Sequence, residues 1–407
     1  MRKKTWWFAL VLAWGGLFPC PGLSFGSGFA LYEAGARSSA LANAVVARAD
    51  DLSAIFYNPA GLTQLPGLQV MGGLTAYFPR TEIVTHAGPV ATRNLMDTNG
   101  FISLHFYTSY QVSNQVCLGL GIFSPFGLGT KFDSGWPGNV SNIKTSIQTL
   151  TINPTIALKA TDYLSFGAGL DVMYFSLDMK RILPIPFIGP QEVAINGHTW
   201  GLGFNLGLLF KPLDYLSVGI SYRSQVKEKV DGASYFHPIN GLDAPVSGSV
   251  ILPDMIFSGI MLRPLKPLSV EAGLIWTHWG LFKRIDLKFE NPLGVLSDQK
   301  DWHDTWRAQL GVEYKLREWL DLRAGYAFEN EPMPNQYVDY LVPTTGYRHN
   351  FSFGPGFHWR AWTLDLAYTL IVLPDKSVNN SKSIGVLPSD FQGRRAQLLG
   401  VSLAYKF

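Results

Sequence analysis

A turn motif that recurs at a fixed spacing constrains the fold of this chain more than any other sequence feature. Its four copies begin at Lys159, Lys211, Arg263 and Lys315, so the spacing is 52 residues each time. A fifth turn of the same kind begins at Trp359. Each copy joins a basic residue to turn-forming residues and then to an apolar segment, as expected of a tight turn between strands. The period predicts pairs of strands that return to one side of a sheet.

The segments between these turns alternate between apolar residues and small or polar ones. In residues 166–174 and 320–329, every second side chain is apolar. This is the period of a β-strand, but the strands of a soluble sandwich have it too. Long loops rich in Pro, Gly, Asp and Asn separate the strand pairs at 183–191, 237–244, 331–345 and 374–393. Tight turns on one rim and long loops on the other favour a barrel of the outer-membrane type.

Strand counting on this pattern predicts an all-β fold, a 14-stranded antiparallel transmembrane β-barrel, in residues 66–407. The expected strands are 67–79, 100–111, 115–123, 144–160, 163–181, 195–211, 215–230, 246–263, 268–289, 302–316, 319–330, 346–359, 361–373 and 394–407. The last strand ends on Phe407, and a C-terminal aromatic residue there resembles the assembly signal of bacterial outer-membrane barrels. The expected location is therefore the outer membrane, with its lipids and the barrel assembly machinery as partners.

Composition agrees with a membrane protein that crosses without helices. Aromatic residues make up 14% of the chain, and no apolar run of eighteen or more follows the N-terminal segment. Residues 1–26 are predicted to be a signal peptide, because basic residues, a short apolar run and small residues at a cleavage site follow one another. Its removal leaves Cys117 as the single cysteine. The net charge of +3 gives no basis for a nucleic-acid partner.

Residues 27–65 lack the alternation and are predicted to form a partly helical hatch. The segment is rich in alanine, and Asp50 and Asp51 stand where the N-cap of a helix is expected. A barrel of fourteen strands has a lumen that is either filled with water or occupied by part of the chain. We therefore place this segment inside the barrel. The alternative is an ordinary N-terminal helical segment.

Several motifs resemble the long-chain fatty acid transporters of the outer membrane, the FadL/TodX type. They are Ser27 to Glu33, Arg48 to Asp51, Tyr57 to Gly61, Ser124 to Gly127, Trp302 to Arg307 and Leu322 to Tyr326. The resemblance spans residues 27–407. It implies passive uptake of hydrophobic compounds, which are captured by loops, pass to a pocket near the hatch and leave sideways at a kinked third strand. The expected substrates are long-chain fatty acids. The alternatives are aromatic or aliphatic hydrocarbons, a general porin, or a structural surface barrel.

The candidate site residues follow from this resemblance and from the loop composition. For ligand capture by the loop we expect Phe123, Phe126, Leu128, Phe132 and Trp136; packing on a neighbouring loop is the alternative. For the inner pocket we expect Phe29 and Leu31, although Phe29 can also be a buried anchor of the hatch. For the hatch turn we expect Asn58, Pro59 and Ala60. For lateral exit we expect a bend at Gly119 and Gly121, whose alternative role is to make room beside the hatch.

Charged residues inside the lumen are expected to pair, because a buried charge is costly without a partner. Arg307 and Arg323 are candidates either for a salt-bridge network between hatch and wall or for binding a substrate carboxylate. The network would include Arg37, Arg48, Asp50 and Asp51. The eight histidines have no metal-ligand spacing, and no nucleophile or phosphate-binding motif is present. We therefore expect no metal, no cofactor and no enzymatic activity.

Overall fold

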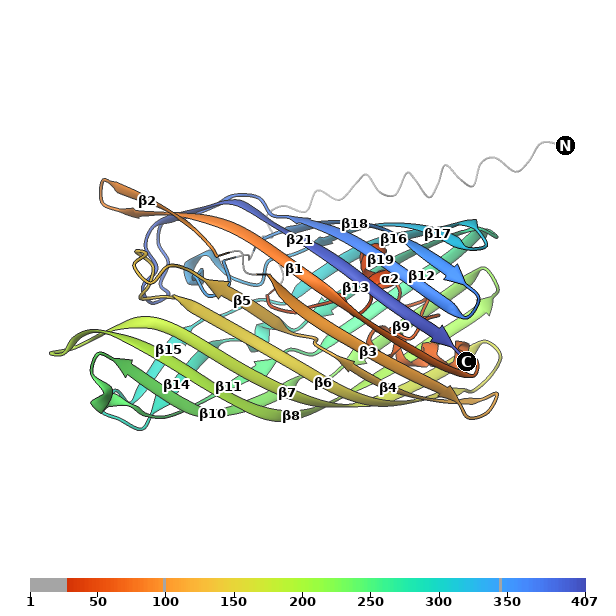
Figure 1. Ribbon diagram of the computed structural model, residues 1–407, viewed down its shortest axis with the longest axis horizontal. Helices are drawn as coiled ribbons and strands as arrows, with labels where there is room; N and C mark the ends of the chain where they lie inside the picture. Colours follow the sequence, from red (N-terminus) through yellow and green to blue (C-terminus); the bar gives the residue numbers. More distant parts are fainter. Residues whose placement is uncertain (1–27, 98–99, 344–345) are drawn as a thin grey trace.

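The alternating segments close into a single antiparallel barrel, in which the first strand pairs with the last (Figure 1). The computed structural model describes residues 28–97, 100–343 and 346–407. The predicted signal peptide lies outside these residues. In the described chain, the wall has fourteen strand positions, as predicted from the strand count. We call each position a stave, because some are occupied by one strand and others by two strands in line. No helix within these ranges is long and apolar enough to cross a membrane.

Some staves consist of two strands in line. Nine staves are single strands: β1 (Leu68–Ala87), β3 (Phe101–Gln111), β6 (Lys144–Lys159), β7 (Leu164–Ile185), β8 (Gly189–Leu213), β17 (Leu320–Glu329), β18 (Arg348–Trp359), β19 (Trp362–Val372) and β21 (Ser389–Lys406). The five split staves are β4 (Val116–Phe123) with β5 (Gly127–Lys131), β9 (Leu216–Arg223) with β10 (Val226–His237), β11 (Ala244–Leu252) with β12 (Met255–Leu265), β13 (Leu268–Thr277) with β14 (Arg284–Phe289), and β15 (Val295–Gln299) with β16 (Thr305–Arg317).

Short elements outside the wall lie at the end of the barrel that carries the long loops. They are β2 (Val90–Leu95), β20 (Lys376–Val378) and the 3₁₀ turns η3 (Asn240–Leu242), η4 (Trp279–Leu281) and η5 (Asn335–Tyr337). Three staves that were expected to be continuous, 215–230, 246–263 and 268–289, are each interrupted. One interruption contains Pro253, which has no N–H for the ladder, and another contains η4.

The recurring turns all lie on one rim of the barrel, as the 52-residue period predicts. The turns after β6, β8, β12 and β16 lie at the end that carries the C-terminus, whereas long hairpins extend from the other end (Figure 1). Every second side chain points outward into the membrane. On β21, for example, Leu399, Val401 and Leu403 are all exposed, and residues between them are buried. The apolar face of the alternation therefore faces lipid, not a core.

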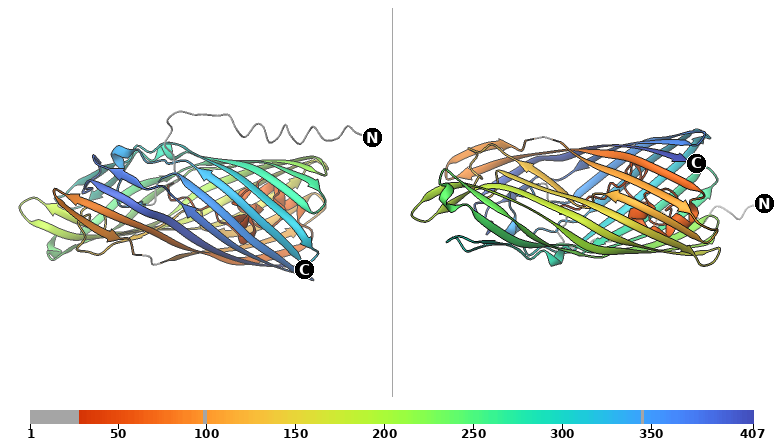
Figure 2. Two further views of the ribbon diagram at one scale, coloured as in Figure 1. Left: turned by 90° about the horizontal axis from the view of Figure 1, so that it is seen from above. Right: turned by 60° about the horizontal axis from the view of Figure 1, so that its bottom comes forward.

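The hatch lies within the ring of strands, where its red ribbon is visible in both views of Figure 2. It contains α2 (Ala36–Ala40), α3 (Ala54–Tyr57) and η2 (Pro59–Gln64). The N-cap of α3 is Ser53, not Asp50 or Asp51 as expected, and Asp51 lies two residues earlier, where its Oδ1 accepts a hydrogen bond from the Ser53 N–H at 2.8 Å.

Small residues on both sides allow the hatch to pack tightly against the wall. A Cβ atom on Gly219 of β9 would lie 2.2 Å from the carbonyl oxygen of Val46. A Cβ atom on Gly325 of β17 would lie 2.3 Å from the carbonyl carbon of Leu41. The alanine-rich composition of the hatch and the glycines of the inner wall thus serve the same close contact.

Candidate ligand-binding site

The barrel wall is interrupted in its third stave. β4 pairs with β3 on one side and with β6 on the other, and its pairing with β3 ends at Ile122, opposite Phe106. β5 pairs with β6 alone, from Gly127 to Lys131. Residues 101–105 of β3 therefore have no partner on the side that faces β5 in the described structure. Two neighbouring staves thus face one another here without a hydrogen-bonded ladder.

The N-terminal end of the hatch fills part of this interruption. Ala30 forms a bridge with Phe126, in the segment between β4 and β5. The Leu31 N–H donates to the carbonyl oxygen of Pro125 at 2.8 Å, and the Gly127 N–H donates to that of Phe29 at 3.0 Å. The hatch therefore provides a short strand at the place where the wall lacks one.

The bend expected at Gly119 and Gly121 is absent. The pairing of β4 with both neighbours is continuous through the two glycines, and the interruption begins after Phe123. A Cβ atom on Gly119 would lie 2.7 Å from Leu62 Cδ1, and one on Gly121 would lie 2.8 Å from Ile55 Cγ2. Both glycines thus make room for the hatch, which was the alternative interpretation.

Two pockets lie on either side of the hatch N-terminus. The first, with an empty volume of about 820 Å³, lies toward the loops and is bounded by Phe175, Ile195 and Val230 among other apolar side chains. The second, of about 780 Å³, lies beside the hatch and includes Phe101 on β3. The residues that line both pockets are Phe29 and Leu128.

The second pocket reaches the interrupted wall. Its lining includes Phe101 on one edge and Gly127 to Thr130 on the other, which are the two strands that do not pair. A Cβ atom on Gly129 would lie 3.6 Å from Phe101 Cδ1, so the edges approach one another closely. The second pocket therefore extends from Phe29 and Leu128 to the unpaired edges of β3 and β5.

Phe29 is the centre of an aromatic cluster that separates the two pockets. Its ring lies 4.8 Å from Trp279 and 6.2 Å from Phe126, measured between centroids, and Phe282 and Trp302 complete the cluster. Phe29 is therefore buried and borders both pockets. Sequence reasoning missed Trp279, Phe282 and Trp302. Trp279 and Phe282 lie within the predicted strand 268–289 and Trp302 begins the next one, so their signal was only a concentration of large aromatic residues.

The residues expected to capture ligand on the loop are mostly buried. Trp136 stacks on Phe132 at 4.1 Å and meets Tyr340 of a neighbouring loop at 4.7 Å, which is the packing that we gave as the alternative to ligand capture. The physical reason is that the two loops bury their aromatic residues against each other. Phe123 instead packs on Phe56 of the hatch.

A network of ion pairs joins the hatch to the wall. Glu313 of β16 accepts hydrogen bonds from Arg37, Arg48 and Arg323, with nitrogen–oxygen distances of 2.8 to 3.1 Å. Arg37 also binds Asp50 at 2.7 Å and Asp51 at 3.4 Å.

The backbone of the hatch and its acidic residues take part in the same network. Glu271 accepts from the N–H groups of Ala47 and Arg48 at 2.8 Å. Burial alone would raise the pKa of Asp50, but the positive charges of Arg37 and Arg48 outweigh it and hold this pKa below its usual value. The hatch is therefore held to the wall through charges on both sides.

The two candidate arginines have different surroundings. Arg323 belongs to the ion-pair network between hatch and wall, because it binds Asp365 at 2.6 Å as well as Glu313. Arg307 lines the second pocket, binds Glu329 at 3.2 Å and lies over the ring of Tyr32. Its Nε is buried and has no hydrogen-bond partner in the described structure. Of the two, only Arg307 borders a space that can hold a ligand.

Asn58 fixes the expected hatch turn. Its side-chain amide donates to the carbonyl oxygens of Val46 at 2.9 Å and Leu208 at 3.0 Å, and its Oδ1 accepts from the Ala60 N–H at 3.2 Å. Pro59 follows at the first position of η2, where a missing N–H is tolerated. The turn therefore links two parts of the hatch to β8.

Metal and thiol chemistry find no support in the described residues. No group of three or more His, Cys, Asp or Glu side chains there has the geometry to hold a metal ion. Cys117 is free and buried on the inner side of β4, as expected of a small apolar strand residue.

Comparison with known proteins places these features in context. A model of the outer membrane protein transport protein family (OMPP1/FadL/TodX) matches residues 22–407. A putative outer membrane protein of Neisseria meningitidis serogroup B is 27% identical, over 94% of this chain and 95% of the relative. A long-chain fatty acid transport protein of Escherichia coli O6:H1 is 25% identical, over 72% of this chain and 75% of the relative.

The fold is shared with a solved structure. The crystal structure of a Pseudomonas aeruginosa FadL homologue superposes with a TM-score of 0.80, at 20% identity, over 94% of this chain and all of the other.

Proposed function

Because the chain belongs to the outer membrane transport protein family (OMPP1/FadL/TodX), we propose that it takes up long-chain fatty acids passively across the bacterial outer membrane. The observation that carries the proposal is the pair of apolar pockets, which lead from the loops to an unpaired edge of the wall. A fatty acid transporter is among the relatives that match most of the chain.

Capture takes place in the pocket below the loops. Its lining is dominated by aliphatic and aromatic side chains such as Ile147, Phe175 and Ile195. Each methylene group that leaves water for such a lining contributes about 0.8 kcal/mol, so an acyl chain binds without any specific polar contact. Because this binding is driven by burial alone, the transport step needs no coupled energy source.

Transfer to the second pocket requires the ligand to pass Phe29. The Phe29 ring separates the pockets and packs on Phe126 and Trp279. We place the carboxylate end of the ligand near Arg307, whose buried Nε lacks a partner, because a guanidinium suits a carboxylate. Arg348 also lines this pocket and donates to the carbonyl oxygen of Gly28 at 3.2 Å.

Exit follows between β3 and β5 into the membrane. Here the ligand meets no complete ladder of backbone hydrogen bonds, so the wall can part without breaking a strand pair. The hatch segment Phe29 to Leu31 makes two backbone hydrogen bonds at this place and must shift to clear the path.

A single substitution at the exit tests this route. Gly129→Leu adds a side chain between the unpaired edges, opposite Phe101, and Gly72→Leu adds the same side chain on β1, near Phe106. We expect the Gly129 variant to reduce uptake of radiolabelled oleate by cells at least about tenfold, while the Gly72 variant transports as the natural chain does.

The outcomes distinguish the rival functions. Full oleate uptake by Gly129→Leu contradicts exit between β3 and β5. If toluene enters through the natural chain and oleate does not, the substrate is an aromatic hydrocarbon. If sucrose enters liposomes that contain the natural chain, the protein is a general porin. If none of the three enters or binds, it is a structural barrel.

A further inference from the structure

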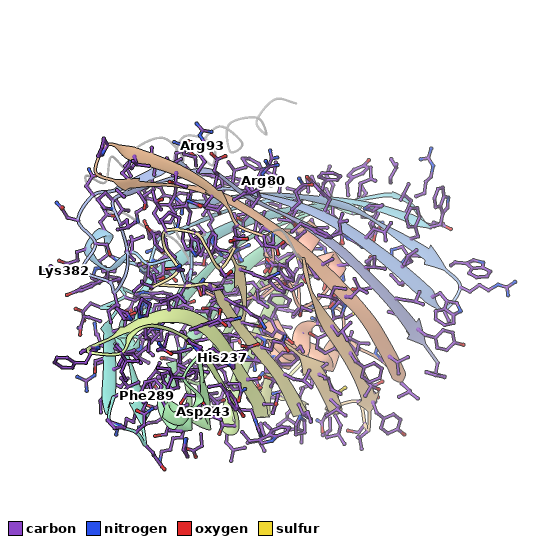
Figure 3. The ribbon with its side chains drawn as sticks, turned by 60° about the vertical axis from the view of Figure 1, so that its left-hand side comes forward. Arg80, Arg93, His237, Asp243, Phe289 and Lys382 are labelled. Atoms are coloured by element: carbon purple, nitrogen blue, oxygen red, sulfur yellow. The ribbon has the colours of Figure 1, made fainter. Side chains whose placement is uncertain are left out.

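Two arginines lie directly opposite each other on the outside of the barrel, where its first and last strands meet. Arg80 of β1 pairs with Arg395 of β21, and Arg395 pairs with Val372 of β19 on its other side. Both arginines are exposed. Figure 3 shows Arg80 projecting away from the barrel, as does Arg93 in the hairpin above it. Two positive charges thus lie next to each other on the same outer face.

This arrangement is unfavourable in the protein alone. Like charges at directly opposed positions of neighbouring strands repel each other. Neither Arg80 nor Arg395 forms an ion pair with any residue that the structure describes. Two carboxylates lie nearby and have other partners: Glu82 binds Arg93 at 2.9 Å, and Asp375 Oδ1 accepts from the Gly393 N–H at 3.0 Å; both line the same groove as the arginines.

The two arginines border a groove on the outer wall. Its empty volume is about 880 Å³, and its lining includes Gln392, Gly393 and Arg394 together with apolar side chains of β19. The register of β1 against β21 shifts between Arg80 and Glu82, so the sheet is irregular at the upper end of the groove. Arg394 is buried, and its Nε has no hydrogen-bond partner among the described residues.

The groove lies at the upper edge of the lipid-facing belt. One row of residues below the arginine pair, Phe78 of β1 is exposed and pairs with Gln397 of β21. Below that row, β21 presents Leu399, Val401 and Leu403 to the membrane. Because the long hairpins mark the outer side of such barrels, this edge faces the outer leaflet.

We propose that the groove binds the phosphate of an anionic glycolipid of the outer leaflet. The guanidinium groups of Arg80 and Arg395 both contact the phosphate, whose charge removes their mutual repulsion. The acyl chains lie along Phe78 and Leu399 below it. A phosphate-bearing lipid satisfies the charged and the apolar parts of this surface together, whereas a free phosphate ion satisfies only the first.

The experiment compares binding of lipid A with and without its phosphates to the full barrel in detergent, by native mass spectrometry. The variant R80Q/R395Q removes both charges, and R80K/R395K keeps the charges but removes the planar fork of donors. The control is K227Q/K229Q, which removes two exposed charges from the outer side of β10, away from the groove. Assembly is checked for each variant by heat-dependent migration in gels.

We expect R80Q/R395Q to bind diphosphorylated lipid A at least about tenfold more weakly, which corresponds to the loss of a charge-assisted contact. The lysine variant should lie between it and the natural chain, and the control should bind normally. Dephosphorylated lipid A should bind weakly to every variant.

Three results overturn the proposal. They are equal binding of both lipids by the natural chain, normal binding by R80Q/R395Q, and equal weakening by the control variant. If millimolar inorganic phosphate displaces lipid A completely, the groove is a site for the free ion and the lipid assignment fails.

Discussion

Removing the negative charge of Glu313 should release the hatch from the wall without unfolding the barrel. Glu313 is nearly inaccessible to solvent and accepts four hydrogen bonds from three arginines: two from Arg37, one from Arg48 and one from Arg323. In Glu313→Gln, the side chain has the same shape but only one acceptor oxygen. Its new N–H₂ group points toward guanidinium donors, and three positive charges lose their common counter-charge.

The size of the effect follows from the geometry. Breaking a buried ion pair by removing one partner costs about 3–5 kcal/mol. Arg37 and Arg323 keep carboxylate partners in Asp50 and Asp365, so we take the lower end, about 3 kcal/mol. The fraction of molecules in which the hatch is detached from the wall then increases by a factor of about 150, since each 1.4 kcal/mol is a factor of ten. Amide hydrogens of the hatch that exchange through this detached state exchange faster by the same factor.

Hydrogen exchange measured by mass spectrometry reports this release directly. The peptide 36–50 contains the amides of Ala47 and Arg48, which are bonded to Glu271 and protected as long as the hatch is in place. We expect its exchange to accelerate by about two orders of magnitude. Peptides from β7 and β21 should exchange as in the natural chain.

The control is Glu318→Gln, the same substitution at an exposed position in the turn that follows β16. It should leave exchange of the hatch unchanged. If Glu313→Gln also leaves peptide 36–50 protected, the hatch is held by packing alone and the reasoning from charge is refuted. If barrel peptides accelerate together with the hatch, the network stabilises the wall and not the attachment of the hatch.

Three further predictions concern other parts of the hatch. Phe29→Ala removes the centre of the aromatic cluster and should destabilise the hatch N-terminus by about 3 kcal/mol, seen as faster exchange in residues 28–31; unchanged exchange would show that the ring is dispensable. Asn58→Ala leaves the Val46 carbonyl without this donor and should weaken the turn by about 1–3 kcal/mol, with protection lost first in residues 58–64. Asp50 has a lowered pKa in the folded protein, so its contribution to hatch stability is present above the unfolded value of about 3.9 and is lost as pH falls below it. Channel conductance in planar bilayers should therefore rise as the pH falls below 4, and Asp50→Asn should remove this rise.

The architecture was predictable because its determinants are local. Turn chemistry repeats every 52 residues, and the alternation assigns each side chain to the lipid or the lumen without knowledge of its neighbours. The position of the hatch followed from a volume argument, since fourteen strands leave a lumen that one segment can occupy. The pairing of Arg37 with wall carboxylates followed from the high energy of unpaired buried charge.

The site itself depended on register, which the sequence does not contain. The interruption after Phe123 arises because β5 pairs with β6 and not with β3, and no residue type marks that choice. Gly119 and Gly121 suggested a bend, but glycine serves equally for a bend and for close packing, and here Ile55 and Leu62 of the hatch occupy the space. Whether Trp136 was exposed depended on Tyr340, which lies about two hundred residues away in the chain.

The middle and the N-terminal end of the hatch are attached with very different strength, and from this difference we predict which part moves. The middle of the hatch is held by Glu313 and Glu271 through several charge-assisted bonds. The N-terminal end is held at the interrupted wall by two backbone hydrogen bonds, each worth about 1 kcal/mol net, and by the packing of Phe29. An apolar ligand that replaces the Phe29 contacts with its own recovers most of that packing energy. We therefore predict that a local shift of residues 29–31 opens the proposed path, while the rest of the hatch stays in place and keeps the lumen closed to water-soluble molecules.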